Sequence, residues 1–327
     1  MVYRRIYHRS VTLLCYAFLF SLASCSSFNG PISDEIDTFY SYSDEVRILV
    51  NSPADADPSR PSILIIYALP NGNTIEMTAG KILKEGDDWH YNIQHIAAQT
   101  RFLRRILKDK NIYTAYLENI QRSWPAWRKK YQYKDSLVSA ILDDVRTKIG
   151  DTTDVILAGH SGGGSFLNGY LNACDSLPGF ISRFAYLDAN YSYEDSLNHG
   201  GKLLQWLRDD STHQLFVLAY DDRRIMLNGK RVVNDTGGTF RATQRMVTRF
   251  SLETEISFRQ DSVIQQFSAF RRRAQFIVHT NPDSLILHTV LVEKNGLIHT
   301  VLFNTPFEEQ AYRFFGDRIY NDLIREE

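Results

Sequence analysis

The stretch that most constrains the fold is a short apolar run followed by glycines around one serine. Residues 155–158 are Val-Ile-Leu-Ala, and residues 159–164 are Gly-His-Ser-Gly-Gly-Gly. The run fits a buried strand, and residues 165–172 fit a helix. Glycines beside Ser161 permit strained backbone angles and close approach of neighbouring elements. The pattern therefore predicts a strand, a sharp turn that exposes the Ser161 hydroxyl, and a helix.

Apolar runs and amphipathic segments alternate on both sides of this turn. Further strands are predicted at residues 46–50, 63–67, 112–117, 184–187, 214–220 and 285–292, and helices at 93–107, 132–149, 202–208, 239–250 and 308–323. A hairpin is expected at residues 224–233, with Asn228-Gly229 at its turn. Because strands that alternate with helices form βαβ units, we expect one α/β domain over residues 46–327 with a mostly parallel central sheet flanked by helices.

The N-terminal residues 1–24 are predicted to be a signal peptide. Three arginines within the first nine residues precede an apolar segment at residues 11–22, which is shorter than the ~20 residues that span a bilayer. The segment ends in Leu22-Ala23-Ser24-Cys25, which resembles a bacterial lipobox. This resemblance implies cleavage before Cys25 and a lipid anchor on its thiol, and an ordinary secretory signal is the alternative.

The polar residues 25–45 predict a flexible tether, which would hold a lipid-anchored protein at the bacterial cell envelope, on its periplasmic side or at the surface. The sequence has three cysteines. With Cys15 in the signal peptide and Cys25 lipidated, Cys174 is the remaining thiol, so no intramolecular disulfide is expected. The net charge of −1 provides no field that would attract nucleic acid.

With these elements in order, the chain resembles the α/β-hydrolase superfamily from residue 46 to its C-terminus. The resemblance rests on the alternating elements, on Gly159-His160-Ser161-Gly162-Gly163, and on the order of serine, then acid, then histidine. It implies acyl transfer through a covalent acyl-enzyme, with Ser161 as the nucleophile. A glycine-rich turn with an incidental serine is the alternative.

The base implied by this resemblance is a histidine on the loop after the last strand. His299 follows the predicted strand at 285–292 and the Asn295-Gly296 turn, so we expect it to take the serine proton. His288 is the second candidate, because a histidine inside that apolar strand is more typical of a core residue. His279 is a weaker candidate.

The acid of the triad has three candidates. Asp221 and Asp222 follow the second strand after the serine turn, where the family usually places the acid, and they are favoured without a choice between them. Asp188 follows the first strand after the turn, a position that some members use. The alternative for each is a carboxylate that caps a loop or helix.

An oxyanion hole needs backbone N–H groups aimed at the developing charge. Gly162, directly after the nucleophile, is expected to supply one. The second is expected from the loop after residues 63–67. Pro70 has no N–H group, so Asn71 is the expected donor, with Leu69 as the second candidate.

Substrate contacts are expected from the loop after residues 112–117. Trp124 and Trp127 could stack on sugar rings, and Arg122 could bind carboxylates. Tryptophans that anchor the loop to the core are an equal alternative. The sequence carries no metal or cofactor motif.

A serine hydrolase behind an export signal resembles the carbohydrate esterases of glycan-degrading bacteria. The resemblance implies cleavage of acetyl or methyl esters on a polysaccharide such as pectin. A lipase or peptidase on the same triad is one alternative, and a non-catalytic glycan-binding lipoprotein is another. The expected partners are therefore an ester substrate and a membrane reached through the lipid, with no nucleic acid.

Overall fold

The computed structural model describes residues 34–326. The signal peptide, the lipidation site at Cys25 and the first part of the expected tether lie outside the described residues and stay predictions. Within residues 34–326, every helix is too short or too polar to cross a membrane.

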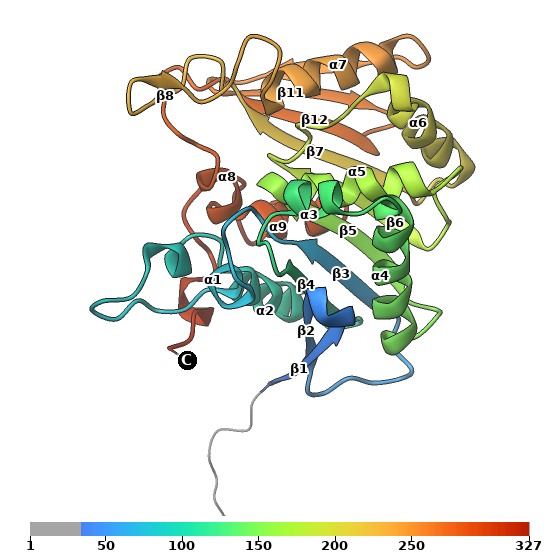
Figure 1. Cartoon of the computed structure of the whole chain (residues 1–327), viewed down its shortest axis with the longest axis vertical. Coiled ribbons are helices and arrows are strands. Elements are labelled where there is room, and N and C mark those ends of the chain that lie inside the picture. The colour runs from blue at the N-terminus through green and yellow to red at the C-terminus, as the bar shows by residue number, and fades with distance from the viewer. Residues whose placement is uncertain (1–33, 327) are drawn as a thin grey trace, which may run out of the picture. The chain divides into compact units, whose positions relative to one another are not determined.

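A ten-stranded sheet runs through the described residues in the order β1-β2-β4-β3-β5-β6-β7-β12-β11-β10 (Figure 1). Its strands are β1 (Glu35–Tyr42), β2 (Val46–Pro53), β3 (Ser62–Ala68), β4 (Asn111–Asn119), β5 (Asp154–His160), β6 (Ile181–Leu187), β7 (Gln214–Tyr220), β10 (Ser257–Gln260), β11 (Ile264–Ala269) and β12 (Ala274–His279). The six central strands, from β4 to β12 in this order, are parallel. At both edges of the sheet the outer strands, β1 and β2 on one side and β11 and β10 on the other, pair antiparallel with their neighbours.

Helices cover both faces of the sheet. One face carries α3 (Trp124–Lys130), α4 (Lys134–Ile149), α5 (Gly164–Ala173), α6 (His199–Asp209) and α7 (Thr239–Ser251), and the other carries α1 (Ile75–Ala79), α2 (Ile96–Ile106), α8 (Val290–Glu293) and α9 (Gly296–Leu302). Successive side chains of a strand alternate between the two cores: Leu64 and Ile66 of β3 pack into one, and Ile65 into the other. This arrangement confirms the predicted α/β architecture.

Two elements predicted near the C-terminus are wrong. Residues 285–292 are an irregular segment that runs into α8, so the last strand of the sheet is β12. The Asn281 side chain exchanges hydrogen bonds with the backbone N–H and C=O of Leu285, at 2.9 Å each, which gives the segment a local alternative to a sheet ladder. Residues 308–323 form turns and a short 3₁₀ helix (Asn321–Leu323), because Glu309 and Phe315 adopt positive φ angles that a right-handed helix excludes.

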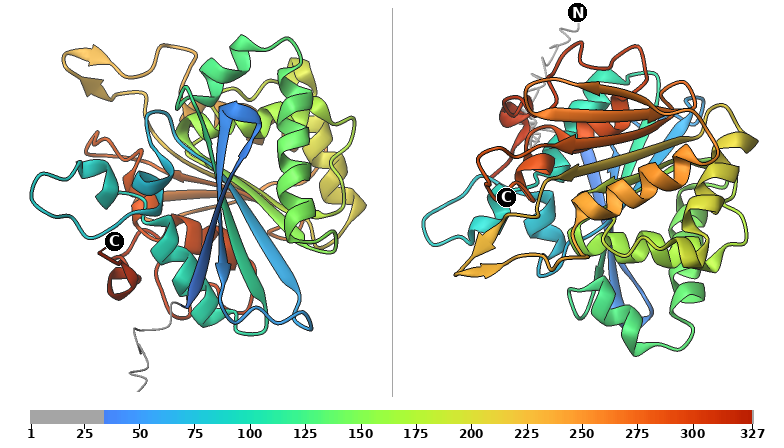
Figure 2. Two further views of the ribbon diagram at one scale, coloured as in Figure 1. Left: turned by 60° about the horizontal axis from the view of Figure 1, so that its bottom comes forward. Right: turned by 90° about the horizontal axis from the view of Figure 1, so that it is seen from above.

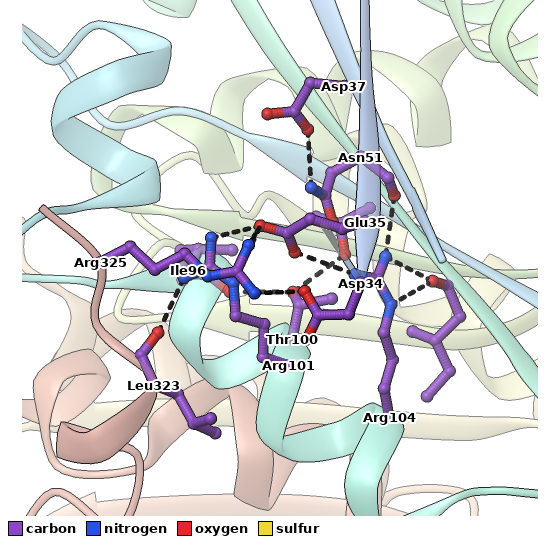
Figure 3. A network of polar contacts seen from close by, with 12 residues as sticks. Asp34, Glu35, Asp37, Asn51, Ile96, Thr100, Arg101, Arg104, Leu323 and Arg325 are labelled. Carbon is purple, nitrogen blue, oxygen red and sulfur yellow. Dashed lines mark hydrogen bonds and ion pairs between the residues drawn. The ribbon is translucent and has the colours of Figure 1, made fainter. Parts of the chain in front are cut away.

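Strand β1 occupies residues 35–42 of the segment 25–45 that was expected to be a tether. Its first residue, Glu35, is 8% exposed and forms ion pairs with three arginines (Figure 3). Arg101 and Arg104 come from α2, and the Arg104 Nη1–Glu35 Oε2 distance is 3.2 Å. Arg325, near the C-terminus, places Nη1 2.9 Å from Glu35 Oε1. The expected domain boundary at residue 46 is therefore too late, and the folded domain includes residue 34 onward.

The predicted hairpin is present as β8 (Met226–Leu227) and β9 (Lys230–Arg231). Asn228 and Gly229 at its turn have φ angles of 51° and 73°, which is the geometry that an Asn-Gly pair favours in a two-residue turn. Both views in Figure 2 show this hairpin and the loop of residues 80–92 projecting from the same side of the sheet.

Candidate active site

Ser161 lies at the tip of the turn between β5 and α5. Its φ angle is 52°, a region that costs energy for a residue with a side chain. The surrounding backbone packs too closely for larger residues. A Cβ atom on Gly163 would lie 2.1 Å from the Ala68 carbonyl oxygen, and one on Gly164 would lie 1.6 Å from the Ala189 carbonyl oxygen. The predicted strand, turn and helix are therefore present, and close contact with neighbouring backbone, rather than a positive φ angle, is what requires these glycines.

A cavity of about 200 Å³ opens beside Ser161. Its lining residues are Pro70, Asn71, Asn73, Trp89, His90, Ile93, Gln94, His160, Ser161, His288 and Thr289. They come from the loops after β3 and β5, from residues 73–94, and from the turn before α8. The cavity therefore lies at the carboxyl ends of the central parallel strands, where ligands bind in open α/β sheets.

His288 and Asp188 meet at this cavity. Asp188 directly follows β6 and is fully buried, and its Oδ2 lies 2.5 Å from His288 Nδ1. The Thr239 hydroxyl donates to the other carboxylate oxygen of Asp188. A carboxylate bound at Nδ1 fixes the orientation of an imidazole and leaves its Nε2 for a second partner. The site thus combines an oriented histidine and a serine on a strained turn.

Two further side chains contact His288. His160 Nε2 donates to the His288 carbonyl oxygen at 3.0 Å, and the two imidazole rings pack with centroids 4.6 Å apart. The Tyr191 hydroxyl lies 3.3 Å from His288 Nδ1. Burial holds the pKa of His160 well below its usual range, so its ring is neutral and carries its proton on Nε2. His160 therefore fixes the backbone of the turn that carries His288.

His299, the expected base, does not line the cavity beside Ser161. It lies in α9, is 4% exposed, and stacks on Phe314 with centroids 4.6 Å apart. The Tyr312 hydroxyl lies 2.9 Å from its Nδ1. Burial lowers the pKa of His299 to about 3, and nearby arginines add to this effect. Because residues 285–292 are not a strand, the loop after the last strand is the one that holds His288.

The other histidine and acid candidates have different partners. His279 ends β12, and its Nδ1 accepts a hydrogen bond from the Asn281 N–H at 3.0 Å. Asp221 accepts two hydrogen bonds from Arg223, at 2.9 and 2.7 Å. Asp222 accepts from the Thr239 N–H at 2.8 Å, and burial together with the charge of Asp188 raises the pKa of Asp222 to about 6. Asp221 and Asp222 were favoured on chain position, but Asp188 is the candidate that the structure brings to His288.

The two expected oxyanion donors lie side by side. A Cβ atom on Gly162 would lie 2.0 Å from the Asn71 Oδ1 atom, so these residues are in contact. Within the loop after β3, the Leu69 and Gly72 N–H groups donate to carbonyl oxygens of other segments, and Pro70 has no N–H. Asn71 lines the cavity, and no hydrogen bond of its N–H group is found among the described residues. Its role in an oxyanion hole stays a prediction.

The residues expected to bind substrate lie elsewhere. Trp124 and Trp127 of α3 are 1% and 3% exposed, and their rings pack edge to face at 5.3 Å. They anchor α3 to the core, as the alternative interpretation held. The Arg122 carbonyl accepts the Gly72 N–H at 2.8 Å, so its backbone supports the loop after β3, but its side chain does not line the cavity.

Several cavity residues were missed at the level of sequence. Trp89, Asn73 and Gln94 belong to no motif in the sequence. The available signal was the position of Trp89 in a polar stretch directly after Gly86-Asp87-Asp88, where a large apolar side chain has little to pack against. Within residues 34–326, no group of three or more histidine, cysteine, aspartate or glutamate residues is placed to hold a metal ion.

No protein-family model matches the chain, and no curated protein matches it in sequence. Among solved structures it is similar to a thermostable esterase at 12% identity and a TM-score of 0.45, over 76% of this chain and 55% of the other, so it spans about half of that protein. It is also similar to the siderophore hydrolase EstB from Aspergillus nidulans, at 11% identity and a TM-score of 0.45, over 84% of this chain and 97% of the other. A feruloyl esterase module from Clostridium thermocellum matches at 11% identity and a TM-score of 0.36, over 57% and 67%.

The sheet order, the two helical layers and the strand–Ser161–helix turn of the chain itself are those of an α/β-hydrolase fold. The similarities to solved structures concern the fold and do not identify the chemistry of the site.

Proposed function

We propose that the chain is a serine hydrolase of carboxylic esters in which Ser161, His288 and Asp188 form the triad. The observation that carries the proposal is the 2.5 Å contact between Asp188 Oδ2 and His288 Nδ1 at the cavity that holds Ser161. A buried carboxylate at Nδ1 stabilises the imidazolium that forms when Nε2 takes a proton.

The reaction follows from this arrangement. The Ser161 Oγ atom attacks the ester carbonyl carbon while its proton passes to His288 Nε2. The carbonyl electrons move to the oxygen, whose charge the Gly162 and Asn71 N–H groups would stabilise. The C–O bond to the alcohol then breaks, and the alcohol leaves with the proton from His288. A water molecule, activated by the same imidazole, releases the acid from Ser161.

The size and charge of the cavity favour a small, uncharged acyl group. A volume of about 200 Å³ is below the ~300–1,000 Å³ of sites that enclose drug-sized ligands. This supports acetyl esters, as on a polysaccharide, over the long acyl chains of a lipase, whereas in a methyl ester of a uronic acid the small group is the alcohol and the acyl group is a sugar ring. Arg122, Trp124 and Trp127, which were expected to bind carboxylates and sugar rings, do not line the cavity.

Labelling with a fluorophosphonate probe tests the triad. We expect the probe to label the wild-type protein on Ser161, and labelling to be lost in Ser161→Ala, because the probe reacts with an activated serine. A wild-type protein that is folded but not labelled, or an equally labelled Ser161→Ala, contradicts the proposal and favours a non-catalytic binding protein. Acetate and methanol release from acetylated xylan and from pectin then separates acetyl from methyl ester cleavage.

A further inference from the structure

The cavity beside Ser161 is lined by three histidines and otherwise by apolar and neutral hydrogen-bonding side chains. Among its described lining residues there is no lysine, arginine, aspartate or glutamate, and Asn71, Asn73, Gln94 and Thr289 carry amides or a hydroxyl. Such a lining is suited to hydroxyl groups and carbonyl oxygens, and it offers no partner for a carboxylate or phosphate.

Asn73 has an unpaired donor at this cavity. Its side chain is 5% exposed, and its Nδ2 atom is buried without a hydrogen-bond partner in the described part of the chain. Buried polar side-chain atoms are paired in the large majority of cases. An unpaired amide at the wall of a cavity is therefore explained most simply by an acceptor that a bound molecule supplies.

Trp89 forms the exposed rim of the same cavity. It is 62% exposed, whereas the other three of the four tryptophans, Trp124, Trp127 and Trp206, are at most 3% exposed. Its indole stacks on the His90 ring with centroids 3.9 Å apart and an interplanar angle of 29°. An indole left in water beside a cavity presents a flat apolar face to whatever occupies the entrance.

The loop that carries Trp89 is held in place at both ends. Asp88 accepts from the His90 N–H at 2.9 Å and contacts its Nδ1 at 2.5 Å. Arg318, from the C-terminal region, donates to the side-chain and backbone oxygens of Asn92, at 2.8 Å each. These hydrogen bonds restrain the backbone on both sides of Trp89, and restraint before binding lowers the entropic cost of ordering the loop.

We infer that Trp89 and Asn73 form a subsite for an uncharged, hydroxyl-bearing ring of the substrate, such as a neutral pyranose. The ring would lie against the indole while its oxygens accept from Asn73, and the ester on that ring would reach Ser161. The inference rests on the proposed ester hydrolysis for its place in the reaction. It defines the substrate class as esters of neutral sugars, ahead of esters of uronic acids, simple aryl alcohols or long-chain alcohols.

A binding experiment on Ser161→Ala tests the subsite without turnover. Because Trp89 is the one exposed tryptophan of the chain, acrylamide quenching of tryptophan fluorescence reports mainly on it. We expect an acetylated methyl xyloside to protect the fluorescence from quenching, and ethyl acetate, which has no ring, not to protect it. Absence of protection by the xyloside overturns the inference even if the wild-type enzyme is active. Protection in a chain that no fluorophosphonate labels retains the subsite and rejects the proposed hydrolysis.

Kinetics of the active enzyme test specificity. We expect Trp89→Ala to lower kcat/KM for the acetylated xyloside by about 10- to 100-fold, mainly through KM, as for one lost stacking contact. Trp89→Phe should restore most of the loss, and Asn73→Ala should act in the same direction. For these variants, kcat/KM for ethyl acetate should change by less than about twofold. This substrate has no ring to bind at the subsite, and the substitutions leave the reacting groups in place. Tyr133→Ala, which removes a 71% exposed aromatic side chain at the start of α4, is the matched control.

Two results would overturn the inference. An equal loss on ethyl acetate would show that Trp89 supports the catalytic groups and does not select a ring. A loss confined to phenyl acetate, with the xyloside unchanged, would assign the indole to aryl esters.

Discussion

His288 and His299 are eleven positions apart in the sequence, yet they lie in opposite environments. The His288 side chain is 24% exposed at a cavity, with the Asp188 carboxylate at Nδ1. His299 is buried against Phe314 and Tyr312, and burial lowers its pKa to about 3. One ring lies beside a carboxylate at a cavity, and the other is kept neutral among aromatic rings. The partner group and access to solvent, rather than position along the chain, decide which histidine can act as a base.

Removing the imidazole of each histidine in turn is the most direct test of this comparison. We expect His288→Ala to lower kcat by at least about 10⁴-fold with little change in the melting temperature, because the serine loses its base. His299→Ala should keep kcat within a few fold and lower the free energy of unfolding by roughly 2–3 kcal/mol, because it leaves a cavity among aromatic side chains. Hydrolysis assays and urea unfolding of both variants measure the two effects. A reversed pattern would return the base to His299.

Asp188 and Asp221 give a second comparison, with a smaller expected effect. Asp188→Asn should lower kcat by roughly 10²–10⁴-fold, because the amide can hold the imidazole in the wrong tautomer and does not stabilise its charge. Asp221→Asn should leave kcat nearly unchanged, since this carboxylate pairs with the half-exposed Arg223 and surface pairs contribute about 0–1 kcal/mol. The comparison is made from steady-state rates on one short-chain ester. Equal losses in the two variants would mean that the geometry at β6 is not what orients the base.

The smallest expected effect concerns Asp222, which shares Thr239 with Asp188. Burial and the charge of Asp188 raise the pKa of Asp222 to about 6, above its ordinary value of 3.8. Between about pH 4 and pH 6 the folded chain therefore holds a proton that the unfolded chain releases, so this group lowers stability as the pH rises through that range. Above pH 6 its contribution is constant.

Asp222→Asn removes this titration. Relative to the wild type, the variant should gain stability from pH 4 to pH 6, by the order of 1–2 kcal/mol. Urea unfolding of both proteins across this range gives the difference, in which the other carboxylates cancel. Parallel stability curves would show that Asp222 titrates as an ordinary carboxylate.

The central part of the fold was predictable from sequence because it depends on local patterns. A strand buried on both faces is a continuous apolar run, and β3, β5 and β7 all have one. The turn at Ser161 carries its own glycines, so its geometry could be predicted before any tertiary contact was known. The same holds for the Asn228-Gly229 hairpin.

The catalytic partners could not be assigned in the same way, because they depend on where long segments end. The run of residues 285–292 is apolar enough for a strand, and hydrogen bonds from the Asn281 side chain were needed to show that it is not one. Because His288 was expected inside that strand, where a core histidine is typical, His299 was the expected base. Three aspartates stand at strand ends, and only the tertiary contact with His288 distinguishes Asp188 from the others. Strand β1 was missed for a related reason, since Glu35 is buried through arginines from two distant segments.

The ion pairs of Glu35 also bring the two ends of the domain together. Arg325 contacts both Asp34 and Glu35, so the first and last parts of the folded domain are adjacent in space. A domain whose ends meet can be reconnected by a short linker and opened at another exposed turn. The Asn228-Gly229 turn projects from the sheet, and a cut there would separate no central strand from its neighbours. The architecture therefore does not depend on the order in which its segments follow one another along the chain. A circularly permuted gene should specify the same cavity.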